Sequence, residues 1–207
     1  MPPAKLTTGR KQRTADPEDA LKRAMAARTP ASRARHAKTG LSAGSRLDRT
    51  VHAMLLRQLY LSLFETRHFP EALAIARQAV ELDVLPDVLH HDAARAALAG
   101  GDLESAVRHL RAASRRAPAS RRPQHLWTLG GTMFLAQRYG EATSALTRAS
   151  RWATREKPLY RAHLALCRIA GGEQLDELQE TIDALAQAPC GQGYGRFVLG
   201  HLASAAG

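Results

Sequence analysis

The pattern of apolar and polar positions along the chain changes at Leu47. From there on, long runs place apolar residues three and four positions apart, and short breaks separate the runs. This spacing puts apolar side chains on one face of an α-helix. No segment of useful length alternates apolar and polar residues as a half-buried strand does. The pattern therefore predicts an all-α fold.

Three of these runs share one internal order. In each, an apolar residue is followed three positions later by alanine, and a second alanine comes seven positions after the first. The first alanines lie 34 and then 36 residues apart, and a fainter copy occupies 175–185. The runs are 67–83, 101–118 and 137–153, with the alanine pairs Ala72 and Ala79, Ala106 and Ala113, and Ala142 and Ala149.

A period near 34 residues with two helices per unit resembles the tetratricopeptide repeat (TPR) family. In that family the first helix of a unit carries a large residue, then leucine, then a small residue, and the second helix carries spaced alanines. The resemblance implies a right-handed superhelical solenoid of three to four helix-turn-helix repeats, because one hairpin cannot bury its own apolar face. The expected TPR domain spans 47–190, with repeats at about 53–86, 87–120 and 123–156 and a degenerate unit at 159–190.

The resemblance assigns the small residues to packing, because a small side chain lets neighbouring helices approach closely. Departures occur: Tyr60 stands where a small residue is expected, Thr154 where proline is expected, and the fourth unit has lost its alanines. The alternative is an unrelated alanine-rich helical bundle. The residues expected in packing are Ala72, Ala79, Ala94, Ala106, Ala113, Gly130, Ala142 and Ala149.

The two ends of the chain differ from its middle. Residues 1–46 contain 11 Lys and Arg against 3 Asp and Glu, a net +8, whereas the rest of the chain has 19 against 16. Such a polar, basic segment is predicted to be mostly disordered. One short helix is expected at 17–28, with Asp16 as a possible N-cap. Residues 191–207 are predicted to form a C-terminal capping helix that covers the last open face.

Composition narrows the class of protein further. Apolar residues make up 44% of the chain and aromatic residues only 5%, so the core must consist mainly of Ala and Leu. The only two cysteines, Cys167 and Cys190, have neither disulfide-framework nor zinc-site spacing. No apolar run reaches the roughly 18–20 residues that span a bilayer, and no secretory signal is recognisable. We therefore expect a cytoplasmic protein.

Candidate catalytic and metal-binding groups are weak. His90, His91 and Asp92 are consecutive, and adjacent residues of a helix point about 100° apart rather than toward one ion. The glycines of 190–196 lack the preceding strand and the G-K-[ST] sequence of a phosphate-binding loop. The sequence predicts no enzyme, no metal site, no cofactor and no small-molecule substrate.

The TPR resemblance implies that the first helix of each unit lines a concave groove. Trp, Tyr and Arg dominate binding hot spots, so an acidic peptide or amphipathic helix would suit such a groove. The alternative is that Trp127 and Phe134 only pack between helices. The groove positions so assigned are Met54, Arg57, Leu61, Phe64, His91, Arg95, Gln124, Trp127, Phe134, Tyr160 and His163.

These features favour a non-enzymatic adaptor or scaffold that binds part of another protein. One alternative is a chaperone, similar to the three-repeat TPR chaperones of secretion systems, that holds an aggregation-prone partner. Another is a factor that associates with nucleic acid or an anionic membrane through residues 1–46. That segment contains no aromatic residue on which bases could stack, since the first aromatic in the chain is Tyr60.

Overall fold

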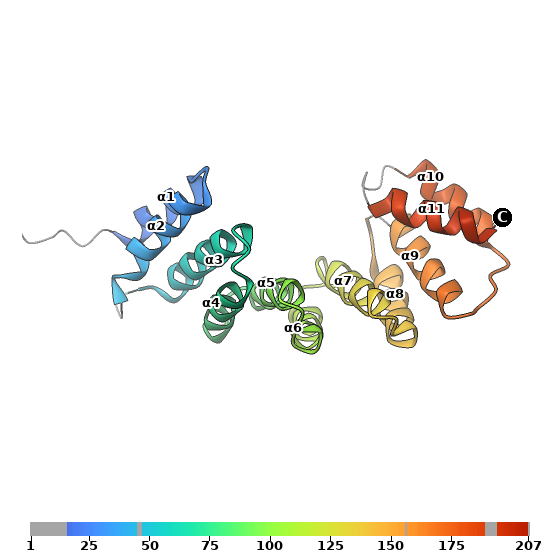
Figure 1. Cartoon of the computed structure of the whole chain (residues 1–207), viewed down its shortest axis with the longest axis horizontal. Helices are drawn as coiled ribbons and strands as arrows, with labels where there is room; N and C mark the ends of the chain where they lie inside the picture. Colours follow the sequence, from blue (N-terminus) through green and yellow to red (C-terminus); the bar gives the residue numbers. More distant parts are fainter. Residues whose placement is uncertain (1–15, 45–46, 156, 189–193, 207) are drawn as a thin grey trace, which may run out of the picture. The chain divides into compact units, whose positions relative to one another are not determined.

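The computed structural model describes residues 16–44, 47–155, 157–188 and 194–206, and the secondary structure of those residues is entirely α-helical apart from turns. This confirms the predicted all-α fold. The described part of the chain contains eleven α-helices (Figure 1). They are α1 (Pro17–Ala26), α2 (Pro30–Leu41), α3 (Arg49–Glu65), α4 (Phe69–Glu81), α5 (Pro86–Ala99), α6 (Leu103–Arg116), α7 (Arg122–Leu135), α8 (Tyr139–Trp152), α9 (Lys157–Ala170), α10 (Leu178–Gln187) and α11 (Tyr194–Ala206).

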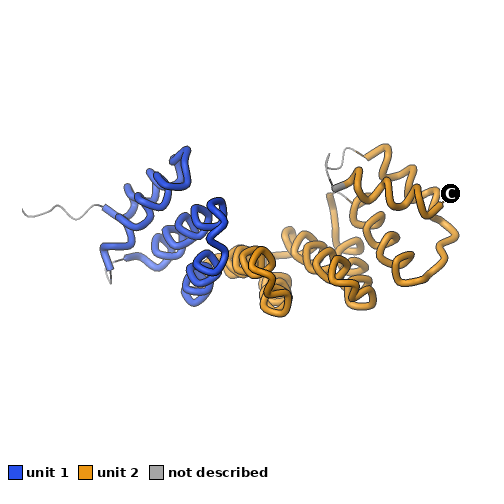
Figure 2. Tube along the Cα trace, viewed as in Figure 1, with its two compact units in different colours: residues 1–82 blue, residues 83–207 orange. Residues whose placement is uncertain are grey.

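Successive helices pack in sequence as antiparallel pairs, an arrangement consistent with a helical repeat. The chain separates into two compact units, Met1–Leu82 and Asp83–Gly207, which Figure 2 colours blue and orange. Unit 1 holds α1 to α4, and unit 2 holds α5 to α11. Each unit is described by itself below.

The turns inside four hairpins have the same backbone geometry. In each, one residue adopts positive φ: Arg67 (63°), Gly101 (81°), Gln137 (58°) and Gly172 (91°). The next residue then donates its N–H to the carbonyl five residues earlier, as Asp102 does to Ala97 at 2.8 Å. This is the helix-ending turn that glycine favours. Only two of the four positions are glycine, so the other two turns form at some cost in backbone energy.

Unit 1 contains more helix in residues 1–46 than the one short helix predicted at 17–28. Pro17–Ala26 and Pro30–Leu41 form two helices that pack on α3, while residues 1–15 and 45–46 lie outside the described residues. Small side chains make this packing possible. At Gly40, an added Cβ would lie 2.8 Å from the side chain of Leu55. The composition of this segment is polar overall, but four of its small residues are buried, Ala20, Ala24, Ala37 and Gly40.

An apolar cluster in unit 2 joins α7 to α11. The small residues assigned to packing are buried in both units. The C-terminal helix α11 buries Val198 and Leu202 against a cluster that includes Leu166 and Leu185. This is the place predicted for a capping helix, although residues 189–193 and 207 lie outside the described residues.

Candidate functional site: a polar network between α5 and α7

The predicted groove residues of unit 1 lie along α3. Met54, Arg57, Leu61 and Phe64 are all half-buried. The Phe64 ring lies 5.5 Å from the ring of Phe69, so it packs against the start of α4. These residues form one face of the first hairpin of the repeat.

In unit 2, the predicted groove residues divide into exposed and buried groups. Arg95 and Gln124 are exposed on α5 and α7, and His91 is half-buried. Tyr160 and His163 on α9 are 5% and 0% exposed, which corrects their assignment as partner-binding residues. The reason is that both rings pack against α7, where Trp127 contacts Tyr160 and His163 and where Phe134 also contacts His163.

Trp127 and Phe134 belong to the same interior cluster. The Trp127 ring stacks on Tyr160 with centroids 5.5 Å apart, and the Phe134 ring meets His163 edge-on at 5.4 Å. Gly131 makes room for this imidazole, because a Cβ there would lie 3.2 Å from Cε1 of His163. Burial lowers the pKa of His163 to about 4. The structure therefore favours the alternative in which these two aromatic residues pack between helices.

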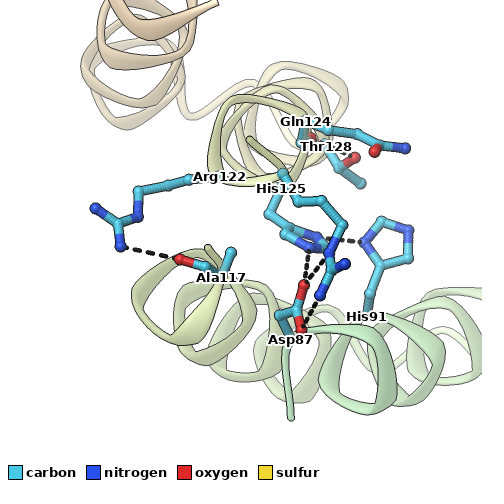
Figure 3. A network of polar contacts seen from close by, with 8 residues as sticks. Asp87, His91, Ala117, Arg122, Gln124, His125 and Thr128 are labelled. Carbon is cyan, nitrogen blue, oxygen red and sulfur yellow. Dashed lines mark hydrogen bonds and ion pairs between the residues drawn. The ribbon is translucent and has the colours of Figure 1, made fainter. Parts of the chain in front are cut away.

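The most developed polar site joins α5 to the start of α7 (Figure 3). Asp87 is only 1% exposed, and its carboxylate accepts two hydrogen bonds from Arg121, from Nε at 2.7 Å and from Nη2 at 3.0 Å. His125 Nε2 lies 3.2 Å from the same carboxylate. In turn, Nδ1 of His125 lies 3.2 Å from Nδ1 of His91. A chain of polar contacts thus runs from Arg121 through Asp87 and His125 to His91.

The helical period explains why these four residues meet. Asp87 and His91 are one turn apart on α5, and Arg121 and His125 are one turn apart where α7 begins. Side chains four apart share a helix face, so two pairs on facing helices can bond together. Figure 3 also shows Gln124 and Thr128 on the α7 side nearest His91. The polar network therefore lies next to the surface of α7 that carries Gln124.

The hydrogen-bonding capacity of each group determines which ring nitrogens of His125 and His91 carry a proton. A carboxylate only accepts hydrogen bonds, so Nε2 of His125 must carry the proton. The Nδ1 atom of neutral His125 is then the acceptor, and His91 donates from its own Nδ1. Burial raises the pKa of Asp87, but the hydrogen bonds from Arg121 and His125 outweigh it and leave that pKa below its usual value. Burial lowers the pKa of His125 despite its contact with Asp87.

A second pair of imidazoles lies on the neighbouring side of α5. Nδ1 of His90 is 2.9 Å from Nδ1 of His109 on α6, with ring centroids 5.2 Å apart. The consecutive residues His90 and His91 thus face different partners, as the 100° helical step requires. No group of three or more His, Cys, Asp or Glu side chains in the described part of the chain is placed to hold a metal ion.

Contacts between repeats follow the repeat length. Asp87 and Arg121 are 34 residues apart, and His91 and His125 are also 34 apart. A third pair, Glu104 and Arg138, forms an ion pair at 2.7 Å across the same separation. Equivalent positions of successive hairpins therefore touch within unit 2.

Sequence reasoning identified His91 but missed Asp87, Arg121 and His125. The apolar and small residues that define the repeat do not include these three polar residues. Asp87 and Arg121 have opposite charges at that distance, and this signal was present in the sequence.

No protein-family model matches the chain, and a search of curated proteins also gave no match. None of the helices in the described ranges combines the length and apolar content needed to cross a membrane.

Proposed function

We propose that the chain is a TPR-type adaptor, without catalytic activity, in which the first helices of unit 2 hold a segment of another protein. The observation that carries this proposal is the contact between equivalent residues 34 positions apart, at Asp87 with Arg121 and His91 with His125. Hairpins stacked in equivalent positions bring the same helix faces side by side, which is how solenoid repeats build extended binding surfaces.

The binding surface in this proposal consists of side chains on α5 and α7. Val88 and His91 are half-buried, and Arg95 and Gln124 are exposed. The buried network beneath them holds the two helices in register, so these side chains have fixed positions before a partner arrives. Such preorganisation favours affinity because less side-chain freedom is lost on binding.

Arg95 indicates the chemistry of the partner. A guanidinium forms its strongest hydrogen bonds with carboxylates, often in a bidentate geometry. A partner segment with an acidic residue and an adjacent apolar residue would meet Arg95 and Val88 together. A peptide or an amphipathic helix could supply this combination.

The test compares partner capture by the full-length chain and by an Arg95→Ala/Gln124→Ala double variant. The exposed pair Arg108→Ala/Ser144→Ala, on the second helices α6 and α8, is the matched control. Bound proteins are quantified by mass spectrometry after affinity purification from native cells. We expect the groove variant to lose a partner that the control retains, with both variants keeping the helical circular dichroism of the parent. Equal capture by both variants would disprove the proposed surface.

A further inference from the structure

Positive charge is concentrated in the middle of unit 2. Residues 105–172 contain 13 Lys and Arg and only 2 Glu, a net +11 that equals the charge of the whole chain. Acidic residues before and after this stretch offset most of its positive charge, so residues 47–207 together contain 19 Lys and Arg against 16 Asp and Glu. The basic character of the chain is therefore not confined to residues 1–46.

The topology brings many of these cations to one end of the unit. Helix α6 ends at Arg116 and α7 begins at Arg122, while α8 ends at Trp152 and α9 begins at Lys157. Because α7 and α8 are antiparallel, the start of α7 and the end of α8 lie together. A direct contact shows this, since the Arg122 guanidinium lies 5.8 Å from the centroid of the Trp152 ring.

The arginines of unit 2 differ in whether a carboxylate neutralises them. Arg111, Arg121 and Arg138 are neutralised by carboxylates at 2.6 to 2.7 Å. Arg148, Arg151 and Arg155 are exposed and form no ion pair within the described residues. Arg115, at the end of α6, is also exposed and forms no ion pair within the described residues. We call the set Arg115, Arg122, Arg148, Arg151, Trp152 and Arg155 the basic end.

Trp152 gives the basic end a second property. Its side chain is 42% exposed, which is unusual for a tryptophan, and the Arg148 guanidinium lies 5.3 Å from its ring centroid. A guanidinium group over an indole ring is attracted to its π-electrons. The result is a flat aromatic surface beside cations that can pair with phosphates.

We propose that the basic end binds single-stranded nucleic acid, with phosphates on its arginines and a base against Trp152. Arg148 and Arg151 are about one turn apart on α8, and Arg155 follows the end of that helix, so several exposed guanidinium groups can meet successive phosphates. Guanidinium is also the side-chain group best suited to bidentate phosphate contacts. Aromatic stacking combined with a cationic surface is the usual way in which proteins hold single strands without reading their sequence. This activity is independent of the adaptor role proposed above.

The experiment measures binding of the full-length chain to fluorescein-labelled oligouridylate and oligothymidylate by fluorescence anisotropy, over a range of salt concentrations. The test variant is Arg148→Gln/Arg151→Gln/Arg155→Gln. The matched control, Arg10→Gln/Lys11→Gln/Arg13→Gln, removes the same charge from the N-terminal segment. Helical circular dichroism verifies that both variants fold.

In a plot of the logarithm of the binding constant against the logarithm of the salt concentration, the basic-end variant should give a slope that is less steep by about 2. Each lost phosphate contact contributes about 0.7 to the steepness for a single strand. The N-terminal control should leave the slope of the parent unchanged. A separate variant, Trp152→Leu, should weaken binding about ten-fold at fixed salt while keeping the slope, since it removes stacking and no charge.

Three results would overturn the proposal. One is a slope loss in the N-terminal control that equals or exceeds that of the basic-end variant. Another is a Trp152→Leu variant that binds as tightly as the parent. The third is equal competition by poly-glutamate or by anionic lipid vesicles at the same total charge, which would identify an acidic protein or a membrane as the partner class.

Discussion

Asp87 accepts two hydrogen bonds from Arg121, which stands 34 residues later in the chain, at equivalent places in successive hairpins. The carboxylate side chain is 2% exposed and the arginine side chain 44% exposed. One partner is thus buried while the other keeps contact with water. This asymmetry decides which substitution does more damage.

Arg121→Ala should destabilise unit 2 more than Asp87→Ala. Removing the arginine leaves a buried carboxylate, a full charge, bonded only to His125. Removing the aspartate leaves an arginine that water can solvate and the neutral Nε2–H of His125 without its acceptor, which costs less than a buried charge. We expect losses of about 2–3 kcal/mol and about 1–2 kcal/mol, measured by urea unfolding. The control is Arg116→Ala, which breaks a pair with Asp83 between side chains that are 43% and 49% exposed. It should change stability by less than about 1 kcal/mol. A larger loss of stability in Asp87→Ala than in Arg121→Ala would contradict this explanation.

Stability should fall with acid because of His163. Burial lowers the pKa of the folded-state imidazole to about 4 from an ordinary value of 6.5. The unfolded chain takes up a proton near pH 6.5 while the folded chain does not. The stabilisation is therefore complete above pH 6.5 and is lost as pH falls toward 4, by about 3 kcal/mol in total. Comparing the pH dependence of unfolding for the parent and His163→Met isolates this effect, since His125 shifts in the same direction in both proteins. If the unfolding free energies of the two proteins depended on pH in the same way, this contribution of His163 would be refuted.

Close helix packing at Gly130 should make alanine harmful there. A Cβ at this position would lie 2.5 Å from Cγ of Leu146, which is the branch point of the side chain and cannot swing aside. Overpacking costs about 1–3 kcal/mol, against a helix-propensity gain of about 1 kcal/mol. We expect Gly130→Ala to lower the melting temperature. The matched control is Gly140→Ala on α8, where nothing lies within 4 Å of the added Cβ. That variant should be neutral or more stable, and equal effects at both glycines would disprove tight packing at Gly130.

Much of the fold could be predicted from individual residues. Glycine tolerates the left-handed conformation that ends a helix, and aspartate is a preferred N-cap. Accordingly φ of Gly101 is 81° at the end of α5, and Asp102 accepts from the N–H of Ser105 at 3.0 Å at the start of α6. Local rules decide such features. The helix expected at 17–28 is present as α1, whereas the polar composition of 30–41 gave no sign of α2, whose small residues Ala37 and Gly40 pack against α3. The burial of His163 was harder still to predict, since it depends on contacts with Trp127, Phe134 and Gly131 on another helix, α7.

The turn between α7 and α8 offers a stabilising change. Gln137 has φ of 58°, whereas the equivalent positions in two other hairpins are the glycines Gly101 and Gly172. A left-handed residue with a Cβ costs about 1–2 kcal/mol, and glycine adds about 0.5–1 kcal/mol of unfolded-state entropy. Gln137→Gly should therefore raise the unfolding free energy by about 0.5–1 kcal/mol. Gln137→Ala keeps the Cβ and should give no gain. Calorimetric melting of both variants tests this prediction. If Gln137→Ala also raised the unfolding free energy, strain from the left-handed backbone at this position would not be the explanation.

Truncation of the N-terminal segment should have opposite consequences at two nearby starting points. A chain that begins at Asp16 keeps α1 and α2, so Leu59 remains packed with Ala24 and Ala37 in the core of unit 1. A chain that begins at Leu47 loses those helices and exposes Leu55 and Leu59, which are 0% and 6% exposed in the structure. Exposing two leucines costs about 3 kcal/mol or more. Hydrogen exchange in α3 should accelerate strongly in the shorter chain only. Equal protection of α3 in both chains would show that α1 and α2 contribute little to unit 1, and the mostly disordered segment first predicted would then be the better description.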